Sequence, residues 1–253
     1  MNIALDSLNT NSVTYKTDED FLYLVDLSDI HVGNMYHNEK VFKKWIKTVQ
    51  GIPNMRVIIG GDSTDNASTH SASSPYEELL HGGDQVLKIR DLLLPIKDKI
   101  LFCRSGNHGY ERALKHNKLI PEHMLAELLG VPFLHGLCSA FITVGENSYL
   151  VSTWHNAKSP KSMGWLDADV IFYEHKHLHH WERELITKPN KSSKTFTLQY
   201  KYHVQTGSFQ GWGGYAADKG YPISECGTNI VRLNGGTYKK RGIKVYSDIE
   251  DIL

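Results

Sequence analysis

Short apolar runs alternate with amphipathic segments along the first half of the chain. The runs at 21–29, 55–62 and 99–109 are largely apolar and end in acidic, glycine, asparagine or histidine residues. Apolar runs of this length are typical of strands that are buried on both faces of a sheet. We therefore expect three buried strands, each followed by a polar loop.

Three other segments have helical character. The segment 38–50 places its apolar side chains on one helical face and its lysines elsewhere. The segment 74–98 also predicts a helix, weakened by a Gly-Gly pair and ending near Pro95. The segment 121–130 begins with proline and ends with glycine, as short helices commonly do.

The second half of the chain consists mostly of strand-like segments. Residues 140–156 predict a β-hairpin with a Gly-Glu-Asn turn, and residues 168–175 predict another buried strand. Strand composition also occurs at 182–187, 195–207, 228–233 and 242–246. This order predicts the α/β class, and we expect a polar N-terminal arm at 1–20 followed by a single domain at 21–253.

The composition excludes several classes of protein. Lys plus Arg and Asp plus Glu both total 28, so the formal net charge is zero and no overall field favours nucleic acid or membrane. The three cysteines form no CxxC pair, which argues against a disulfide framework and fits a reducing cytoplasm. Neither a secretory signal nor an apolar run long enough to span a bilayer is visible, so we expect a cytoplasmic protein without a membrane partner.

Side chains that could bind a metal ion or a substrate follow five of the predicted strands. In α/β sheets, ligands bind at the carboxyl ends of the strands, so these side chains are expected to converge. Residues i and i+2 of an extended segment point to the same side, which would let Asp-x-His and His-x-His reach one cavity. Oxygen and imidazole donors without thiolates suit manganese, iron or zinc. The side chains are Asp29, His31, Asp62, Asn107, His108, His155, His175 and His177.

Each of these pieces has an ordinary explanation when it is taken alone. An Asp and a His after a strand are often a loop cap, Gly-Gly-Asp is a common turn, and four histidines in "YEHKHLHHW" (173–181) could be an exposed polar stretch. Their shared position, each after a predicted strand, favours a metal site.

The chain resembles the calcineurin-like metallophosphoesterases in five motifs that occur in the family's order. The family pattern is D-x-H, G-D-x-x-D, G-N-H, a single His and then G-H-x-H. The tail "VQTGSFQGWGGYAADKGYP" (204–222) is also similar to small phosphoesterases of phages and prophages, which would place the protein in the host cytoplasm. The five motifs are SDIHVG (28–33), GGDSTD (60–65), GNHGYER (106–112), STWHN (152–156) and EHKH (174–177).

The resemblance implies a four-layer αββα sandwich of two mixed β-sheets flanked by helices. It also implies a hydrolase with two divalent metal ions, most often Mn²⁺, with Fe, Zn, Ni or Mg as alternatives, and a hydroxide that bridges them. His108 is implied as the catalytic residue above the scissile phosphate. The implied ligands are Asp29, His31 and His177 for one ion, Asn107, His155 and His175 for the other, and Asp62 as the bridge.

Three further residues are interpreted as supporting this site. We expect Asp26 and Asp65 to orient metal-binding histidines, which usually need a second hydrogen-bond partner. Arg112 is a candidate contact for a phosphate oxygen, with an ordinary surface arginine as an equal alternative. Two positions depart from the family pattern: Glu174 stands where glycine is usual, and Gly109 stands where a carboxylate commonly follows G-N-H.

The substrate is less well defined than the chemistry. We expect a phosphodiesterase or phosphatase that acts on nucleotides or nucleic-acid ends. The alternatives are a DNA exonuclease or endonuclease of the repair type, a mononuclear zinc hydrolase, and a non-catalytic metal-binding scaffold. Basic groups at 188–201 and 239–241 could line a nucleic-acid path with Tyr200, Tyr202 and Trp212, although a solvated face is the simpler explanation.

Overall fold

The computed structural model describes residues 11–67, 71, 74–156, 163–190, 192–236 and 242–252. Its strands are β1 (Ser12–Thr17), β2 (Phe21–Leu27), β3 (Met55–Ile59), β4 (Ile100–Arg104), β5 (Phe133–Leu134), β6 (Cys138–Val144), β7 (Asn147–Trp154), β8 (Val170–Tyr173), β9 (His180–Asn190), β10 (Thr195–Gln205), β11 (Ile230–Asn234) and β12 (Ile243–Tyr246). Its α-helices are α2 (Glu39–Gly51), α3 (Gly82–Leu93), α4 (Leu114–Asn117), α5 (Pro121–Leu129) and α6 (Gly214–Asp218). Shorter helical turns are η1 (Pro75–Glu77), η2 (Leu94–Lys99), η3 (His108–Ala113) and η5 (Ile249–Ile252).

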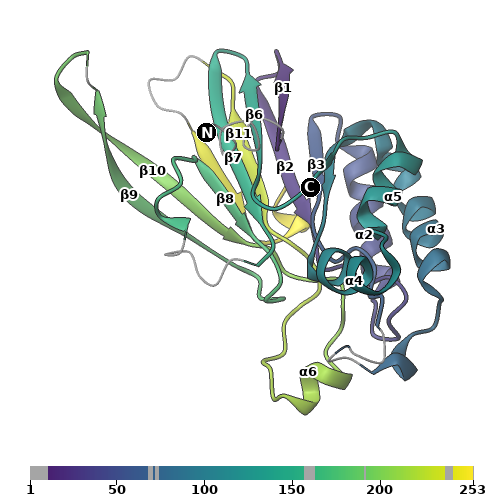
Figure 1. The fold of residues 1–253 in the computed structure, drawn as a ribbon. Coiled ribbons are helices and arrows are strands. Elements are labelled where there is room, and N and C mark those ends of the chain that lie inside the picture. The colour runs from purple at the N-terminus through teal and green to yellow at the C-terminus, as the bar shows by residue number, and fades with distance from the viewer. Residues whose placement is uncertain are drawn as a thin grey trace, which may run out of the picture.

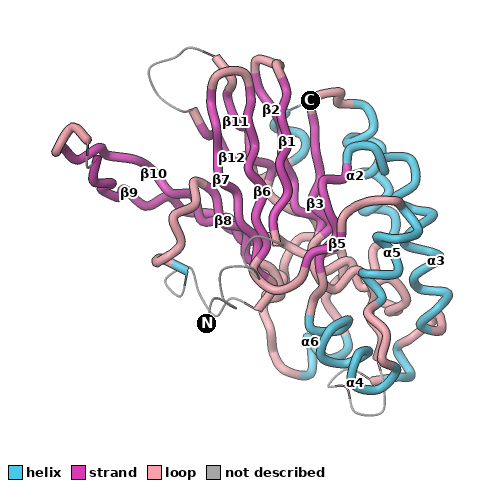
Figure 2. The backbone as a smooth tube through the Cα atoms, turned by 45° about the horizontal axis from the view of Figure 1, so that its top comes forward, coloured by secondary structure: helices cyan, strands magenta, loops and turns pink. Residues whose placement is uncertain are grey.

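Two mixed sheets pack face to face (Figures 1 and 2). The helix-covered sheet has the order β12-β11-β2-β3-β4-β5, and β2 to β5 run parallel. The hairpin sheet has the order β1-β6-β7-β8-β10-β9, and it ends in the long β9–β10 hairpin that projects from the body in Figure 1. The predicted pair of mixed sheets with helices outside is confirmed.

The pleat of β2 explains how one strand serves two cores. Leu22 and Leu24 face the hairpin sheet, where they meet Ile58, Phe102 and the apolar side chains of β6 to β8. The alternate residues Val25 and Leu27 face α2, α3 and α5 on the other side. Because both faces are covered, the strand is apolar on both faces, with the buried Asp26 as the exception.

Helix α2 shows how local signals fix the outer layer. The side chain of its N-cap, Asn38, accepts a hydrogen bond from the Val41 amide at 3.2 Å. Its buried face consists of Phe42, Trp45, Ile46 and Val49. The helices α2, α3 and α5 all lie on the outer face of the helix-covered sheet (Figure 2). On the other outer face, a loop places Met163 and Leu166 against Ile171 and Tyr173 of β8.

The polar arm predicted for residues 1–20 differs in part from the structure. Residues 12–17 form strand β1, which pairs in parallel with β6. Val13 and Tyr15 turn inward and pack against the core between the sheets, while Lys16 is exposed. The alternation of β-branched and aromatic residues in "SVTYKT" is a strand signal that the polar composition of the segment concealed. Residues 1–10 lie outside the described part of the chain.

The parallel strands bring their carboxyl ends to a common edge. In the helix-covered sheet these are the ends of β2, β3 and β4, and in the hairpin sheet they are the ends of β7 and β8. Every predicted metal ligand follows one of these five strands. Among the described helices, none has both the length and the apolar character that a membrane span requires.

Candidate metal centre

Asp and His side chains of the described residues form three groups that could hold metal ions. His31, Asp65 and His108 make up one of them, and the other two share Asp29. Of these two, the first group consists of Asp29, His31 and His177, and the second of Asp29, Asp62, His155 and His175. Within each group the candidate ligand atoms lie within 4.8 Å of one another. Asp29 belongs to both of these two groups, whereas the family resemblance implied this shared role for Asp62.

In the group of Asp29, His31 and His177, there are more hydrogen-bond acceptors than donors. The Nδ1 of His31 lies 2.9 Å from Asp65 Oδ1 and donates to this carboxylate, so the neutral ring has its lone pair on Nε2. That Nε2 lies 3.2 Å from His177 Nε2, which in turn lies 3.3 Å from Asp29 Oδ1. Asp29 Oδ1 is buried and accepts no hydrogen bond. A cation among these atoms would satisfy all of them.

The second group has the same excess of acceptors. His155 Nε2 lies 2.9 Å from Asp62 Oδ2 and 3.0 Å from Asn107 Oδ1. Burial opposes ionisation of Asp62, but His108 and His155 hold the pKa of its carboxyl well below the usual range. Asp62 and Asp29 in turn raise the pKa of His155 well above its usual value, against the effect of burial, so in the metal-free site the proton on Nε2 lies where a divalent cation would bind. This set of donors fits a divalent cation.

The backbone at the predicted ligands is strained. Asp29, His31, Asp62, His175 and His177 all have positive φ, between 50° and 80°, a region that residues other than glycine rarely adopt. Strain of this kind costs about 1–3 kcal/mol per residue and is concentrated at functional sites. The i, i+2 prediction from an extended segment was therefore wrong in its geometry. The strands end before these residues, and left-handed turns place the alternate side chains together.

His108 lies beside the metal-binding groups and opens the π-helical turn η3. Its amide donates to Asp62 Oδ1 at 2.8 Å, and its Nδ1 donates to the carbonyl oxygen of Asp65 at 2.7 Å. Its Nε2 lies 3.6 Å from Asp62 Oδ2. Burial lowers the pKa of His108, but Asp62 and Asp65 outweigh burial and raise the pKa above its usual value.

The two predicted orienting residues behave differently. Asp65 contacts His31, as described above, and also accepts from Asn34. Asp26 instead accepts from the Thr153 hydroxyl at 2.9 Å, and burial together with the neighbouring Glu174 raises its pKa well above the usual range. Among the described contacts of Asp26, none is to a histidine of the site. Glu174 makes that contact, because its Oε2 lies 2.8 Å from His155 Nδ1.

Gly109 is explained by a carboxylate that comes from elsewhere in the chain. A Cβ at Gly109 would lie 1.8 Å from Glu122 Oε2, so a side chain at 109 would collide with Glu122. Glu122 is fully buried in the first turn of α5. Burial, with the charge of Asp62 as a second cause, raises the pKa of Glu122 to about 8. Gly109 thus leaves room for Glu122. The acidic group near His108 comes from helix α5 and not from residue 109.

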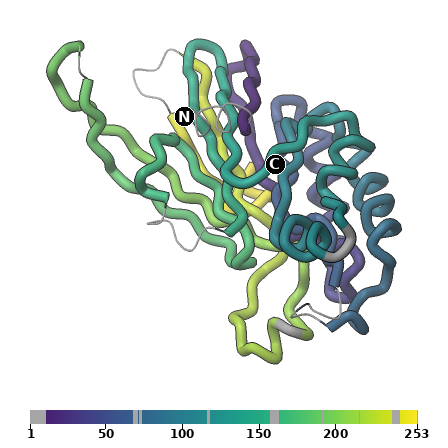
Figure 3. Tube along the Cα trace, viewed as in Figure 1, coloured from purple at the N-terminus to yellow at the C-terminus, as the bar shows by residue number. Residues whose placement is uncertain are grey.

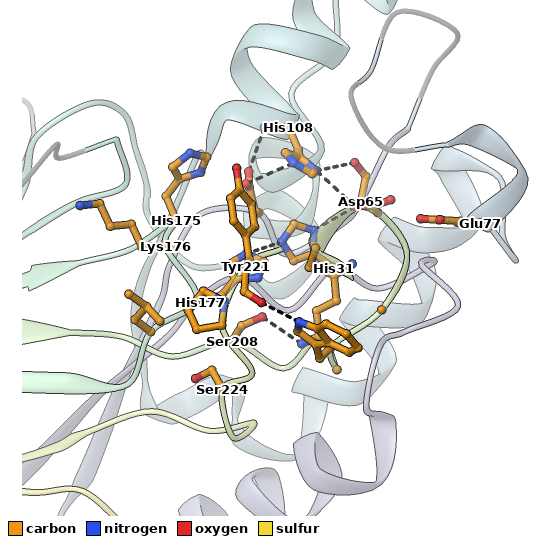
Figure 4. Close-up of a pocket in the computed structure, with 18 of the residues that line it drawn as sticks. His31, Asp65, Glu77, His108, His175, Lys176, His177, Ser208, Tyr221 and Ser224 are labelled. Carbon is orange, nitrogen blue, oxygen red and sulfur yellow. Dashed lines mark hydrogen bonds and ion pairs between the residues drawn. The ribbon is translucent and has the colours of Figure 1, made fainter. Parts of the chain in front are cut away.

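A cavity of about 540 Å³ opens onto the metal-binding groups (Figure 4). His31, Asp62, His108 and Arg112 line one part of it, and Trp212 and Tyr221 line another. The aromatic wall belongs to the excursion between β10 and β11 that carries α6 (Figure 3).

The segment 207–227 within this excursion is anchored to α2 and the turn before it. The Phe209 side chain is buried against Phe42 and Trp45, and its carbonyl oxygen accepts from the Asn38 amide at 2.7 Å. The Gly211 amide donates to the Tyr36 carbonyl oxygen at 2.7 Å. The tail motif at 204–222 therefore contributes to the wall of the cavity, which the sequence alone did not indicate.

Some of the residues considered for a nucleic-acid path are engaged within the protein. Lys201 is buried and donates to the carbonyl oxygens of Gly164 and Leu166, and Lys188 pairs with Asp167. The Tyr202 ring is buried in the core, so it offers no stacking surface. Lys191 and residues 239–241 lie outside the described residues.

Sequence reasoning overlooked Arg104, which is 2% exposed and donates to Glu174 Oε2 at 2.8 Å. A signal was present, because Arg104 follows "ILFC" at the end of one buried strand and Glu174 follows "VIFY" at the end of another. Charges in such positions need a partner of opposite sign. Their pairing could not be deduced without knowing that the two strand ends meet.

Comparison with known proteins identifies similar structures but no family. No protein-family model and no curated protein matches the sequence. Among solved structures, the chain is similar to one described as a novel phosphatase from Mycoplasma pneumoniae, with 10% identity and a TM-score of 0.36. The match covers 92% of this chain and 96% of the other. The functional assignment consequently depends on the geometry of this chain's own residues.

Replacing Asp29 tests whether the acceptor-rich groups bind a divalent cation. We expect Mn²⁺ to raise the unfolding temperature of the wild type, because a ligand that binds only the folded state stabilises it. Asp29→Asn should lose this gain, so that its unfolding temperature is the same with Mn²⁺ and with EDTA. Thermal unfolding with Mn²⁺ and with EDTA measures both effects. The exposed variant Asp98→Asn is the control, and an equal Mn²⁺ gain in Asp29→Asn would exclude Asp29 as a ligand.

Proposed function

We propose that the protein is a metal-dependent phosphoesterase, a phosphodiesterase or phosphatase that acts on nucleotides or nucleic-acid ends. The observation that carries the proposal is the position of two acceptor-rich Asp and His groups at the inner end of an open cavity, with His108 beside them. Two divalent ions held there, by our proposal Mn²⁺, would neutralise phosphoryl oxygens and make a water molecule more acidic. The ligands would be Asp29, His31, Asp62, Asn107, His155, His175 and His177.

His108 is the proposed catalytic residue. Its Nδ1 is held by the Asp65 carbonyl oxygen, so the ring is fixed and Nε2 is the atom available for proton transfer. In the protonated ring, Nε2–H would donate to a leaving oxygen. The Asp62 carboxylate, 3.6 Å away, stabilises that charge. Arg112 lines the same cavity and would contact a phosphate oxygen.

The walls of the cavity support a nucleotide-sized substrate. A volume of about 540 Å³ is within the usual range for small-molecule sites. The Trp212 ring can stack on a base, and its Nε1 donates to the Tyr221 carbonyl oxygen at 2.8 Å, which fixes its position. The basic residues in the region 188–201 support a binding path for long DNA less well than the cavity supports a nucleotide site.

A metal-resolved activity panel tests the function. Purified protein would be loaded separately with Mn²⁺, Ni²⁺, Zn²⁺ or Mg²⁺ and assayed on bis-p-nitrophenyl phosphate, p-nitrophenyl phosphate, cyclic nucleotides and DNA. We expect hydrolysis of the small esters, fastest with Mn²⁺ and abolished by EDTA. If no metal supports hydrolysis of any of these substrates, the enzyme proposal fails and a metal-binding scaffold becomes the better explanation.

The role of His108 predicts a separation of turnover from metal binding. We expect His108→Asn to lower kcat by about 10²- to 10⁴-fold, the usual contribution of a general acid or base. Bound Mn²⁺, measured by elemental analysis, should stay at the wild-type level. His123→Asn replaces an exposed histidine on α5 and serves as the control. Unchanged kcat in the Mn²⁺-loaded variant would remove His108 from the mechanism.

The role of Trp212 predicts an effect that depends on the nucleoside. Thymidine 5′-(p-nitrophenyl phosphate) and methyl p-nitrophenyl phosphate share a leaving group and differ in the nucleoside. Trp212→Ala should raise KM for the first by roughly 5- to 150-fold, the loss of one stacked base, and should change KM for the second much less. Trp212→Phe should keep most of the affinity. Equal changes for both substrates would contradict a base-binding role.

A further inference from the structure

Glu174 is a fully buried carboxylate at the junction of the two sheets. It immediately follows β8 of the hairpin sheet, yet its Oε2 accepts hydrogen bonds from two groups of the helix-covered sheet. These are the Gly61 amide at 2.6 Å and the Arg104 Nη1 at 2.8 Å. The same oxygen lies 2.8 Å from His155 Nδ1. One atom thus joins the ends of β3, β4, β7 and β8.

This contact determines which nitrogen of His155 faces the metal-binding group. A carboxylate can only accept, so Nδ1 of His155 must carry the proton that lies between them. In the neutral ring the lone pair is then on Nε2, the atom that faces Asp62 Oδ2 and Asn107 Oδ1. Both ends of the imidazole are therefore fixed, and the ring presents a ligand atom to the second group.

The surrounding residues are arranged so that the carboxylate fits. A Cβ at Gly60 would lie 2.5 Å from Asp26 Oδ1 and 3.0 Å from Glu174 Cδ, and a Cβ at Gly61 would lie 2.4 Å from His155 Nδ1. The Gly-Gly pair therefore lets the end of β3 approach both side chains closely enough for the Gly61 amide to bond with Glu174. Larger residues at either position would force the two sheets apart at the site.

The charge of Glu174 is also balanced within the protein. Arg104 is 2% exposed, and besides Glu174 its guanidinium donates to the Gly136 carbonyl oxygen at 2.8 Å through Nη2. A buried carboxylate without such a partner would be strongly disfavoured. Arg104 therefore supplies the counter-charge for Glu174, whose Oε2 is the acceptor that faces His155 Nδ1.

We propose that Glu174, balanced by Arg104, is a positioning residue that fixes His155 for a divalent cation in the group Asp29, Asp62, His155 and His175. This rests on the metal centre of the proposed function but not on hydrolysis. Carboxylate partners of this kind orient a ligating imidazole and increase its basicity. The group that contains His31 and His177 has its own partner in Asp65, so the two groups are expected to respond separately to a change at Glu174.

The first test measures the wild-type protein and uses a variant only to assign its signals. In Zn²⁺-loaded protein labelled with ¹⁵N, the His155 ring should bind metal through Nε2 and carry its proton on Nδ1. Long-range ¹H–¹⁵N correlation spectra distinguish this state, and loss of the signals in His155→Gln assigns them. Binding through Nδ1, or a ring that exchanges between both tautomers, would overturn the proposal.

The second test measures Mn²⁺ affinity by calorimetry in Glu174→Gln. We expect the affinity of one Mn²⁺ to fall by about 10- to 100-fold, as for other partners of metal-binding histidines, while the affinity of the other ion stays the same. The control is Asp169→Asn, which changes a buried acid at the opposite end of β8 that accepts from the Leu150 amide. Unchanged affinities in Glu174→Gln, or an equal fall at both sites, would overturn the proposal.

A third variant covers the case in which Glu174→Gln fails to fold because Arg104 is left without a counter-charge. Glu174→Gln combined with Arg104→Met removes both charges, and it should fold while still binding one Mn²⁺ with about 10- to 100-fold lower affinity. Wild-type affinity in this double variant would exclude a positioning role. Failure of the phosphoesterase proposal would be recognised separately, as wild-type Mn²⁺ binding without hydrolysis of any substrate.

Discussion

The structure is organised around an excess of buried hydrogen-bond acceptors where the two sheets meet. Asp29 and Asp62 are carboxylates whose pKa values lie below the usual range, even though burial opposes their ionisation. Around them, imidazole nitrogens of His31, His155 and His177 lie within about 3–4 Å of one another or of carboxylate oxygens. Charged histidines, His155 among them, lower these pKa values in the metal-free protein, and a divalent cation would take over that role.

The backbone at the predicted ligands is strained. Five predicted ligands have a positive φ, and the strands that carry them end at least one residue before the ligand. Two well-packed cores and the hydrogen bonds of the strand ends hold these turns in place. The apolar strands thus serve the site by supplying the rigidity that strained turns require. The long loop that carries Trp212 is tied to α2 through Phe209, so the cavity wall depends on the same core.

Most of the fold and most of the candidate site could be predicted because the signals are local. Short segments of sequence are enough to recognise the buried strands, the capped helix α2 and the candidate ligands that directly follow strands. Strand β1 was missed because an edge strand with one exposed face contains polar residues. The Arg104–Glu174 pair and the proximity of Glu122 to Gly109 were missed for a different reason. Each joins segments that are distant in sequence, and only the packing of the sheets and of α5 brings them together.

The two departures from the family pattern have a common physical explanation. An acidic side chain is absent at Gly109 and is supplied by Glu122, and a carboxylate is added at Glu174 and is balanced by Arg104. Both changes alter which element carries an acidic group beside the candidate metal ligands, while each acid remains buried. The two acids nevertheless differ in ionisation: burial raises the pKa of Glu122 to about 8, whereas Arg104 and His155 overcome burial and lower the pKa of Glu174 to about 2. Only Glu174 therefore carries a permanent charge at neutral pH, and that charge is the one in contact with a predicted ligand.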